Sequence, residues 1–151
     1  MINIQVDEAY QEPGLEELIA LAARTALNLK GPGSEETDLS IVVTSDDEIQ
    51  QLNHQFLEND SPTDVLSFPG GEIDPDTHRE NLGDIIISFD RARTQALARQ
   101  GTVESEIQLL VVHGVLHLLG FDHADDREKA EMWSLQHKAL KALNLESINP
   151  S

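Results

Sequence analysis

An apolar segment that carries two histidines at helical spacing constrains this chain more than any other feature. His113 and His117 lie four residues apart, and most residues around them are valine or leucine. Residues four apart on an α-helix project from nearly the same face, one turn from each other. Imidazoles in apolar surroundings need polar partners, because burying an unpaired polar group is unfavourable. The segment therefore predicts a helix that offers two imidazoles to one ligand.

A glycine and a third histidine follow this pair. Gly120 comes three residues after His117, where a helix can end in the left-handed conformation that glycine adopts without strain. A chain that reverses there can return His123 as a third imidazole. Three protein ligands with an open fourth position are typical of a catalytic zinc site. We therefore predict that His113, His117 and His123 bind one divalent ion per chain, zinc in the first place, although nickel and copper also suit imidazole.

The composition narrows the class of protein. The chain has 151 residues, of which 39% are hydrophobic and 25% charged, as in an ordinary globular protein of one domain. It has no cysteine, which excludes disulfides and thiolate ligands. No segment approaches the roughly 20 apolar residues that span a bilayer, and the first residues do not resemble a signal peptide. We expect one domain over residues 1–151, located in the cytoplasm and without a membrane partner.

The net charge of −18 opposes binding to nucleic acid, because non-specific affinity comes from lysine and arginine that neutralise phosphates. The charge is unevenly spread: residues 1–60 hold 13 acidic and 2 basic side chains, and residues 61–100 hold 7 and 4. Arg79, Arg91, Arg93 and Arg99 lie in the second stretch and can form a local basic patch, and the first three are the candidates for substrate binding. The alternative is an acidic surface that serves only solubility.

The period of the hydrophobic residues changes along the chain. Alternation and β-branched runs indicate strands, and apolar residues three or four apart indicate helices. The predicted strands are 2–6, 39–44, 65–68 and 82–89, the predicted helices are 15–30, about 46–57, 91–99, 105–119 and 125–143, and 72–81 is expected to be an exposed loop. This order predicts an α+β fold, with a mixed β-sheet of about four strands packed against helices. The metal site would lie on a helix of the C-terminal half and the turn after it.

The three histidines and Gly120 also have the spacing of the zinc ligands in the metzincin proteases. Those enzymes have a glutamate directly after the first histidine, which acts as general base. Gly114 stands at that position here. A peptidase would therefore lack its proton acceptor, but a zinc hydrolase of another substrate such as peptide remains an alternative.

Three motifs together resemble the YbeY family of metal-dependent endoribonucleases, which mature ribosomal RNA in bacteria. The family pattern His-Gly-x-Leu-His-Leu-x-Gly-Phe/Tyr-Asp-His is met at every position of 113–123. The motifs Pro-Thr-Asp-Val-Leu-Ser-Phe-Pro and Leu-Gly-Asp-Ile-x-Ile-Ser stand at 62–69 and 82–88, in family order. The resemblance implies cleavage of single-stranded RNA, maturation of the 3′ end of small-subunit (16S) ribosomal RNA, and ribosome quality control. Ribosomal particles and ribosome-associated proteins are the implied partners.

The motifs also supply three aspartates as candidates for catalysis. Asp122, beside the third histidine, can orient an imidazole or take a proton, with a turn-capping role as the alternative. Asp64 and Asp84 lie in the other two motifs, where each lines the cleft or holds a turn or strand end. We favour a structural role for Thr63 and Ser67 of the same segment.

One position departs from the family pattern. The family usually has an arginine five residues before the Pro-Thr-Asp motif, and the resemblance assigns it to substrate contact. Leu57 stands there in this chain. Together with the net charge, this departure favours a second hypothesis, a metal-binding ribosome assembly factor with little nuclease activity.

Overall fold

Four strands form one mixed sheet in the order β1-β2-β4-β3. The computed structural model describes residues 1–31, 36–57, 63–121 and 125–145. The strands are β1 (Ile2–Val6), β2 (Thr37–Thr44), β3 (Val65–Ile73) and β4 (Glu80–Ser88). β1, β2 and β4 run parallel, whereas β3 is antiparallel to β4 and forms one edge of the sheet.

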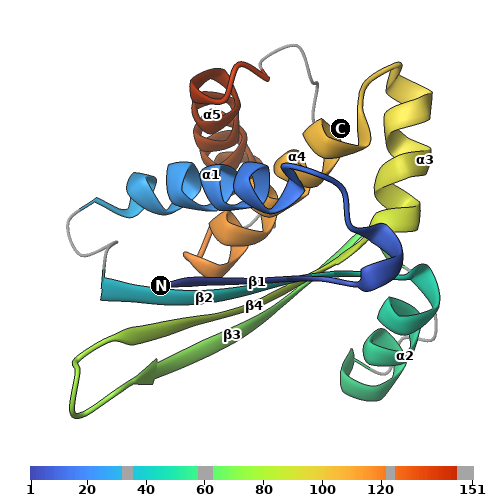
Figure 1. The fold of residues 1–151 in the computed structure, drawn as a ribbon. Helices are drawn as coiled ribbons and strands as arrows, with labels where there is room; N and C mark the ends of the chain where they lie inside the picture. The colour runs from blue at the N-terminus through green and yellow to red at the C-terminus, as the bar shows by residue number, and fades with distance from the viewer. Residues whose placement is uncertain (32–35, 58–62, 122–124, 146–151) are drawn as a thin grey trace.

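Helices lie on both faces of this sheet (Figure 1). The helices are α1 (Leu15–Leu27), α2 (Asp46–Leu57), α3 (Phe89–Arg99), α4 (Val103–Leu118) and α5 (Asp126–Ala142), with short 3-10 turns at Glu8–Tyr10 and Asn28–Lys30. α1 and α4 cover one face, α5 packs on them, and α2 lies against the other face. The prediction of a single α+β domain with a mixed sheet of about four strands is confirmed. In the described part of the chain, no helix is long and apolar enough to cross a membrane.

Two cores of unequal size follow from this arrangement. Side chains alternate between the faces of a sheet, and Ile41 and Ile85 belong to the set that points toward α1 and α4. Ile86 points the other way and packs with Leu66 and Ile49 under α2. The larger core includes these fully buried helix residues: Ile19, Ala22, Ala23, Val111, Val112, Val115 and Leu116. α4 is thus embedded in the main core, and its histidines belong to a fixed part of the fold.

The expected loop at 72–81 is shorter in the structure. β3 continues to Ile73 and pairs with β4 from Glu80, and the backbone N–H of Asp74 donates to the carbonyl of Arg79 at 2.8 Å. The prediction was wrong at both ends of this segment because strand pairing satisfies backbone groups whatever the side chains are. The large apolar residue of this segment, Ile73, is exposed, so no hydrophobic alternation marks the ends of the two strands in the sequence.

α4 crosses β4 at Gly114, which fixes the height of the helix above the sheet. A Cβ atom at this position would lie 3.0 Å from both Cδ1 and Cγ2 of Ile85. Ile85 is fully buried in the main core, so its side chain has little room to move. Ser67 of β3 pairs with Ile85 in the sheet, which brings the edge strand beside the same turn of α4.

The end of α4 has the geometry that the sequence predicts for Gly120. This glycine has φ of 102°. Its N–H donates to the carbonyl of His117 at 3.0 Å, and the N–H of Phe121 donates to the carbonyl of Leu116 at 3.0 Å. These two bonds make a Schellman motif, which turns the chain away from the helix axis. The predicted helix end is confirmed.

We expect Gly114→Ala to lower the free energy of unfolding, measured by urea denaturation. Overpacking against Ile85 costs about 1–3 kcal/mol, whereas alanine gains only about 1 kcal/mol over glycine inside a helix. Gly101→Ala is the control, because a Cβ there would meet only Oγ of Ser105, at 3.9 Å. The control should change stability by about 0.5 kcal/mol or less. A Gly114→Ala protein as stable as the wild type would contradict this account of the crossing.

Candidate metal centre

Two imidazoles meet on one face of α4. The Nε2 atoms of His113 and His117 lie 3.1 Å apart, and the ring planes are inclined by 74°. Zinc–nitrogen bonds of about 2.0–2.1 Å at the tetrahedral angle hold two nitrogens about 3.3 Å apart. The observed separation is close to that value, so the pair fits one ion as it stands. The structure thus brings together two of the three predicted ligands.

The third predicted ligand, His123, and the neighbouring Asp122 lie outside the described residues. Within residues 1–31, 36–57, 63–121 and 125–145, no three histidine, aspartate or glutamate side chains are placed to hold one ion. The three-histidine site therefore stays a prediction, and the geometry of the first two histidines is consistent with it.

The histidine pair lines a pocket between α4 and the edge strand β3. The pocket has a volume of about 400 Å³. Its wall consists of Asp64, Val65, Leu66, Ser67, Pro69, His113, His117 and Leu118. The second sequence motif and the histidine motif therefore form opposite walls of one cavity. Asp64 is the acidic side chain among these lining residues, so the pocket combines two imidazoles with one carboxylate.

Two side chains of α3 contact carboxyl groups in this region: Gln95 contacts Asp64, and Arg99 contacts Glu106. Gln95 donates from Nε2 to Oδ2 of Asp64 at 3.2 Å. One turn further along α3, Nε of Arg99 lies 3.4 Å from Oε1 of Glu106 on α4. Side chains four apart on a helix are neighbours, so α3 contacts the carboxyl groups of both Asp64 and Glu106, and the charge of Asp64 acts on Glu106.

Glu106 is a buried acid. It is 1% exposed, and its Oε2 atom has no hydrogen-bond partner among the described residues. Burial raises the pKa of the Glu106 carboxyl, the Arg99 guanidinium lowers it, and the negative charge of Asp64 raises it further. The net direction is upward, because a charged carboxylate is costly away from water. Glu106 therefore favours its neutral form more than an exposed glutamate does.

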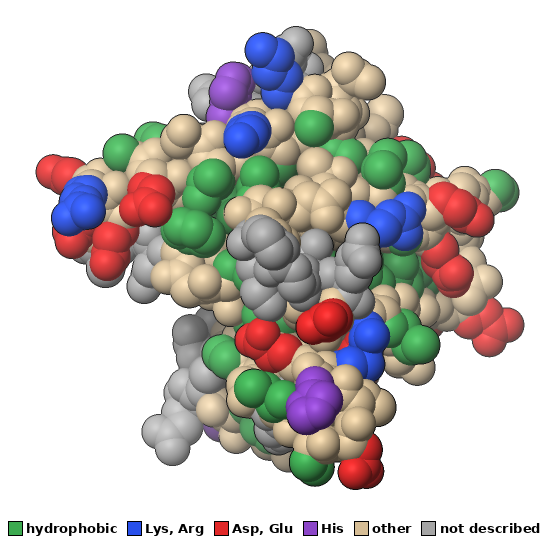
Figure 2. Space-filling model, turned by 90° about the vertical axis from the view of Figure 1, so that its left-hand side faces the viewer, with side chains coloured by type: hydrophobic (Ala, Val, Ile, Leu, Met, Phe, Trp, Pro, Cys, Tyr) green, Lys and Arg blue, Asp and Glu red, His purple; other side chains and the backbone are tan. Residues whose placement is uncertain are grey.

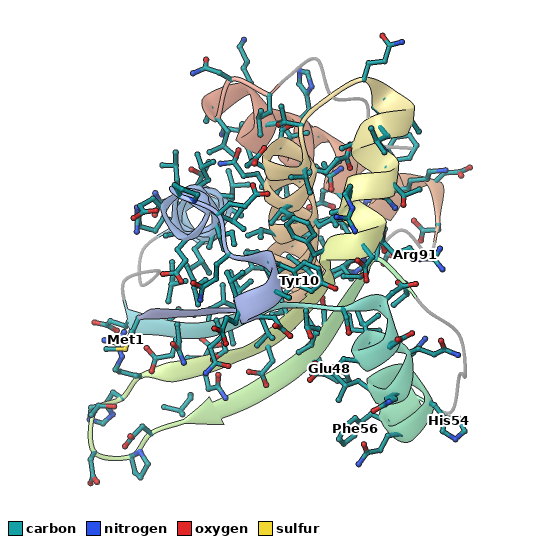
Figure 3. All side chains as sticks on the ribbon, turned by 45° about the vertical axis from the view of Figure 1, so that its right-hand side comes forward. Met1, Tyr10, Glu48, His54, Phe56 and Arg91 are labelled. Atoms are coloured by element: carbon teal, nitrogen blue, oxygen red, sulfur yellow. The ribbon has the colours of Figure 1, made fainter. Side chains whose placement is uncertain are left out.

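Arg79 lies far from the arginines with which it was predicted to form a patch. Its Nη2 atom lies 2.8 Å from Oδ1 of Asp38, which also accepts from the N-terminal ammonium group of Met1. Hydrogen bonds from Arg79 and from that ammonium group lower the pKa of Asp38 to about 2. Figure 3 shows Met1 at the end of the sheet opposite Tyr10 and Arg91. The strand that separates the arginines, β4, spans about 30 Å.

Arg91 and Arg93 follow β4 at the start of α3. Nε of Arg91 lies 3.1 Å from Oδ1 of Asp46, and Nη2 of Arg93 lies 3.2 Å from Oδ1 of Asp90. This end of β4 adjoins the pocket, since Ser88 donates its backbone N–H to the carbonyl of Asp64 at 2.9 Å. No arginine belongs to the pocket wall described above. The role of these arginines in substrate binding therefore stays a prediction.

Asp84 is not brought together with the histidines. It is exposed on β4, where it pairs with Ser40 on one side and Phe68 on the other. Its neighbour Ile85 faces α4, so Asp84 projects from the opposite face of the sheet. Ser67 and Thr63 are half-buried, and Ser67 faces the pocket.

Sequence reasoning missed two buried polar residues beside the site, Glu106 and Gln136. Gln136 lies on α5, is 2% exposed, and has its Oε1 atom 3.0 Å from Nδ1 of His113. Both residues left a signal, because each stands four residues from an apolar core residue on a helix: Glu106 from Leu110, Gln136 from Met132 and Leu140. A polar residue within an apolar stripe marks a side chain that requires a partner.

We expect Glu106→Gln to become more stabilising, relative to the wild type, as the pH rises above about 4.5. The folded-state pKa of Glu106 is raised above its unfolded value, so its favourable contribution is complete below that unfolded value and is lost as the pH rises through the folded pKa. Glutamine does not titrate. Urea denaturation of both proteins between pH 4 and pH 8 measures the difference. A difference independent of pH would show that Glu106 is ionised in the fold as readily as in the unfolded chain.

Three comparisons with known proteins agree on the family of this chain. The family model for endoribonuclease YbeY matches residues 1–144. The YbeY endoribonucleases of Halalkalibacterium halodurans and Pelotomaculum thermopropionicum are 39% and 40% identical, over 95% of this chain and 98% and 92% of theirs. The solution structure of TM1509 from Thermotoga maritima superposes with a TM-score of 0.65 at 28% identity, over 99% of this chain and 97% of that one. The family predicted from the three motifs is confirmed: the chain belongs to the endoribonuclease YbeY family.

Proposed function

We propose that this protein is a zinc-dependent endoribonuclease that cleaves single-stranded RNA, with His113, His117 and His123 as metal ligands. As the family resemblance implies, its target is the 3′ end of small-subunit ribosomal RNA, and it acts on ribosomal particles in the cytoplasm. The observation that carries the proposal is the position of two imidazole Nε2 atoms, 3.1 Å apart, on the wall of a pocket that also contains Asp64.

The donor set suits a reaction at phosphorus. Neutral imidazoles add no charge to a divalent ion, which when bound would supply a Lewis acid for a phosphoryl oxygen. Asp64 is half-buried in the pocket wall and is oriented by the amide of Gln95. We assign Asp64 the role of proton acceptor for the attacking hydroxyl group, because a positioned carboxylate can serve as a general base.

A flexible strand of RNA fits this site better than a duplex. The pocket lies between α4 and an edge strand, and a single strand can bend to place one phosphodiester in it. The rest of the surface gives RNA little attraction, since the net charge is −18. On the face seen in Figure 2, lysine and arginine side chains are scattered, several of them beside aspartate and glutamate side chains, and they form no continuous basic stripe.

Gly114 argues against a peptidase of the metzincin type. The space that a side chain would need at this position is already taken by Ile85. A glutamate there would require Ile85 or α4 to shift. The second hypothesis, an assembly factor that binds metal and cleaves poorly, retains the support of Leu57 and of the net charge.

We expect His117→Ala to abolish cleavage of a labelled single-stranded RNA and to reduce the bound metal, measured by elemental analysis of the purified protein. Asp64→Asn should keep the metal and lower the rate of cleavage by about 10²–10⁴-fold, the usual contribution of a general base. The two variants thus separate loss of the ion from loss of the proton acceptor.

His54→Ala is the matched control, because His54 is exposed on α2, away from α4 (Figure 3). It should cleave RNA at the wild-type rate. Equal cleavage by His117→Ala and the wild type would reveal a contaminating nuclease. Absence of cleavage by the wild type, with binding to ribosomal particles that survives His117→Ala, would favour the assembly factor.

A further inference from the structure

A buried glutamine of α5 contacts the nitrogen of His113 that faces away from His117. Gln136 is 2% exposed, and its Oε1 atom lies 3.0 Å from Nδ1 of His113. The same face of α5 otherwise buries apolar side chains, among them Met132 and Leu140. An amide at such a position is unfavourable unless it is hydrogen-bonded. The bond to His113 links two helices whose contacting residues are 23 positions apart in the sequence.

We propose that Gln136 is a positioning residue, which holds His113 in the tautomer that can bind a metal ion through Nε2. A neutral imidazole carries its proton on only one of two nitrogens. The amide oxygen can only accept, so this bond requires the proton on Nδ1. Nε2 of His113 then keeps its lone pair, and this is the atom that lies 3.1 Å from Nε2 of His117. The inference rests on the proposed function, since both concern the same metal site.

The same bond fixes the orientation of the ring. A histidine side chain rotates about two single bonds, and packing alone does not distinguish a ring from its flipped form. With Nδ1 tied to Gln136, the opposite edge of the ring faces the pocket that His113 lines. α5 therefore contributes to the site without itself forming part of the pocket wall.

The neutrality of Gln136 is compatible with the proposed reaction at phosphorus. Metal-bound histidines often donate to a carboxylate, which makes the imidazole a more basic ligand. An amide accepts the same hydrogen bond without adding negative charge near the ion. A site that must attract a phosphodiester within a chain of net charge −18 gains from keeping the full positive charge of the ion.

The test compares Gln136→Met with a matched control, Gln108→Met. Gln108 is also buried, at 5% exposed, but its Nε2 atom donates to the carbonyl of Leu18 on α1. Each variant loses one hydrogen bond of a buried glutamine, and only the bond of Gln136 reaches a histidine. The affinity for zinc is measured by calorimetric titration of the metal-free protein with zinc sulfate. Gln136→Met should bind zinc about 10- to 100-fold more weakly, the usual effect of losing a residue that hydrogen-bonds to a metal ligand. Gln108→Met should bind zinc as the wild type does.

A readout independent of the metal follows the tautomer directly. In metal-free wild-type protein, two-bond ¹H–¹⁵N correlation spectra at a pH where the ring is neutral should show His113 protonated at Nδ1. Gln136→Met should lose this preference. Gln136→Glu, which keeps an acceptor oxygen, should retain both the tautomer and zinc binding.

The outcomes separate this inference from the proposed function. A wild-type protein that does not bind zinc would overturn the proposed function. If the wild type binds zinc, and Gln136→Met keeps both the Nδ1–H tautomer and the wild-type affinity, the positioning role is overturned while the metal site stands. Equal weakening of zinc binding by Gln136→Met and Gln108→Met would also overturn it, because that result would reflect stability alone.

Discussion

The close approach of α4 to β4 is the constraint on which the site depends. Gly114 leaves no gap above Ile85, which is itself held in the main core. The histidines stand one residue before and three residues after this contact, so their height above the sheet is set by packing and not by a loop. The edge strand β3 is held at the same height because Ser67 pairs with Ile85. One apolar contact thus fixes both walls of the pocket, and a site built on rigid elements is positioned more accurately than one on loops.

Three polar side chains of α4 each contact a different neighbouring helix. Glu106 lies beside Arg99 of α3, Gln108 donates to α1, and His113 contacts Gln136 of α5. Inside a protein, a satisfied polar contact adds little net stability, but an unsatisfied one is costly. These contacts therefore select one arrangement of the helices around α4, since a slip of any helix would leave a buried polar group without its partner.

The sequence predicts those parts of the molecule that depend on local spacing. The two histidines four residues apart and the glycine that ends α4 are local features, and the helices and strands follow from the hydrophobic period. The face on which Asp84 projects depends on its register with Ser40 and Phe68, which no local pattern contains. The distance between Arg79 and Arg91 likewise depends on their lying at opposite ends of one strand. The contact between Gln136 and His113 depends on how α5 packs against α4, which no local pattern contains. A polar residue among apolar ones on one face of a helix indicates only that it has some partner.

The chain belongs to a ribonuclease family, yet its net charge of −18 repels the phosphates of RNA at long range. The attraction for phosphate must therefore be local. The three candidate arginines each lie beside an aspartate: Arg79 beside Asp38, Arg91 beside Asp46, and Arg93 beside Asp90. Such surface pairs contribute little stability, but each cancels the long-range field of its arginine. The proposed ion at the histidine pair would then be the main positive charge near the pocket. Under this proposal the metal site anchors the RNA as well as supplying the chemistry, and long-range charge adds little to binding.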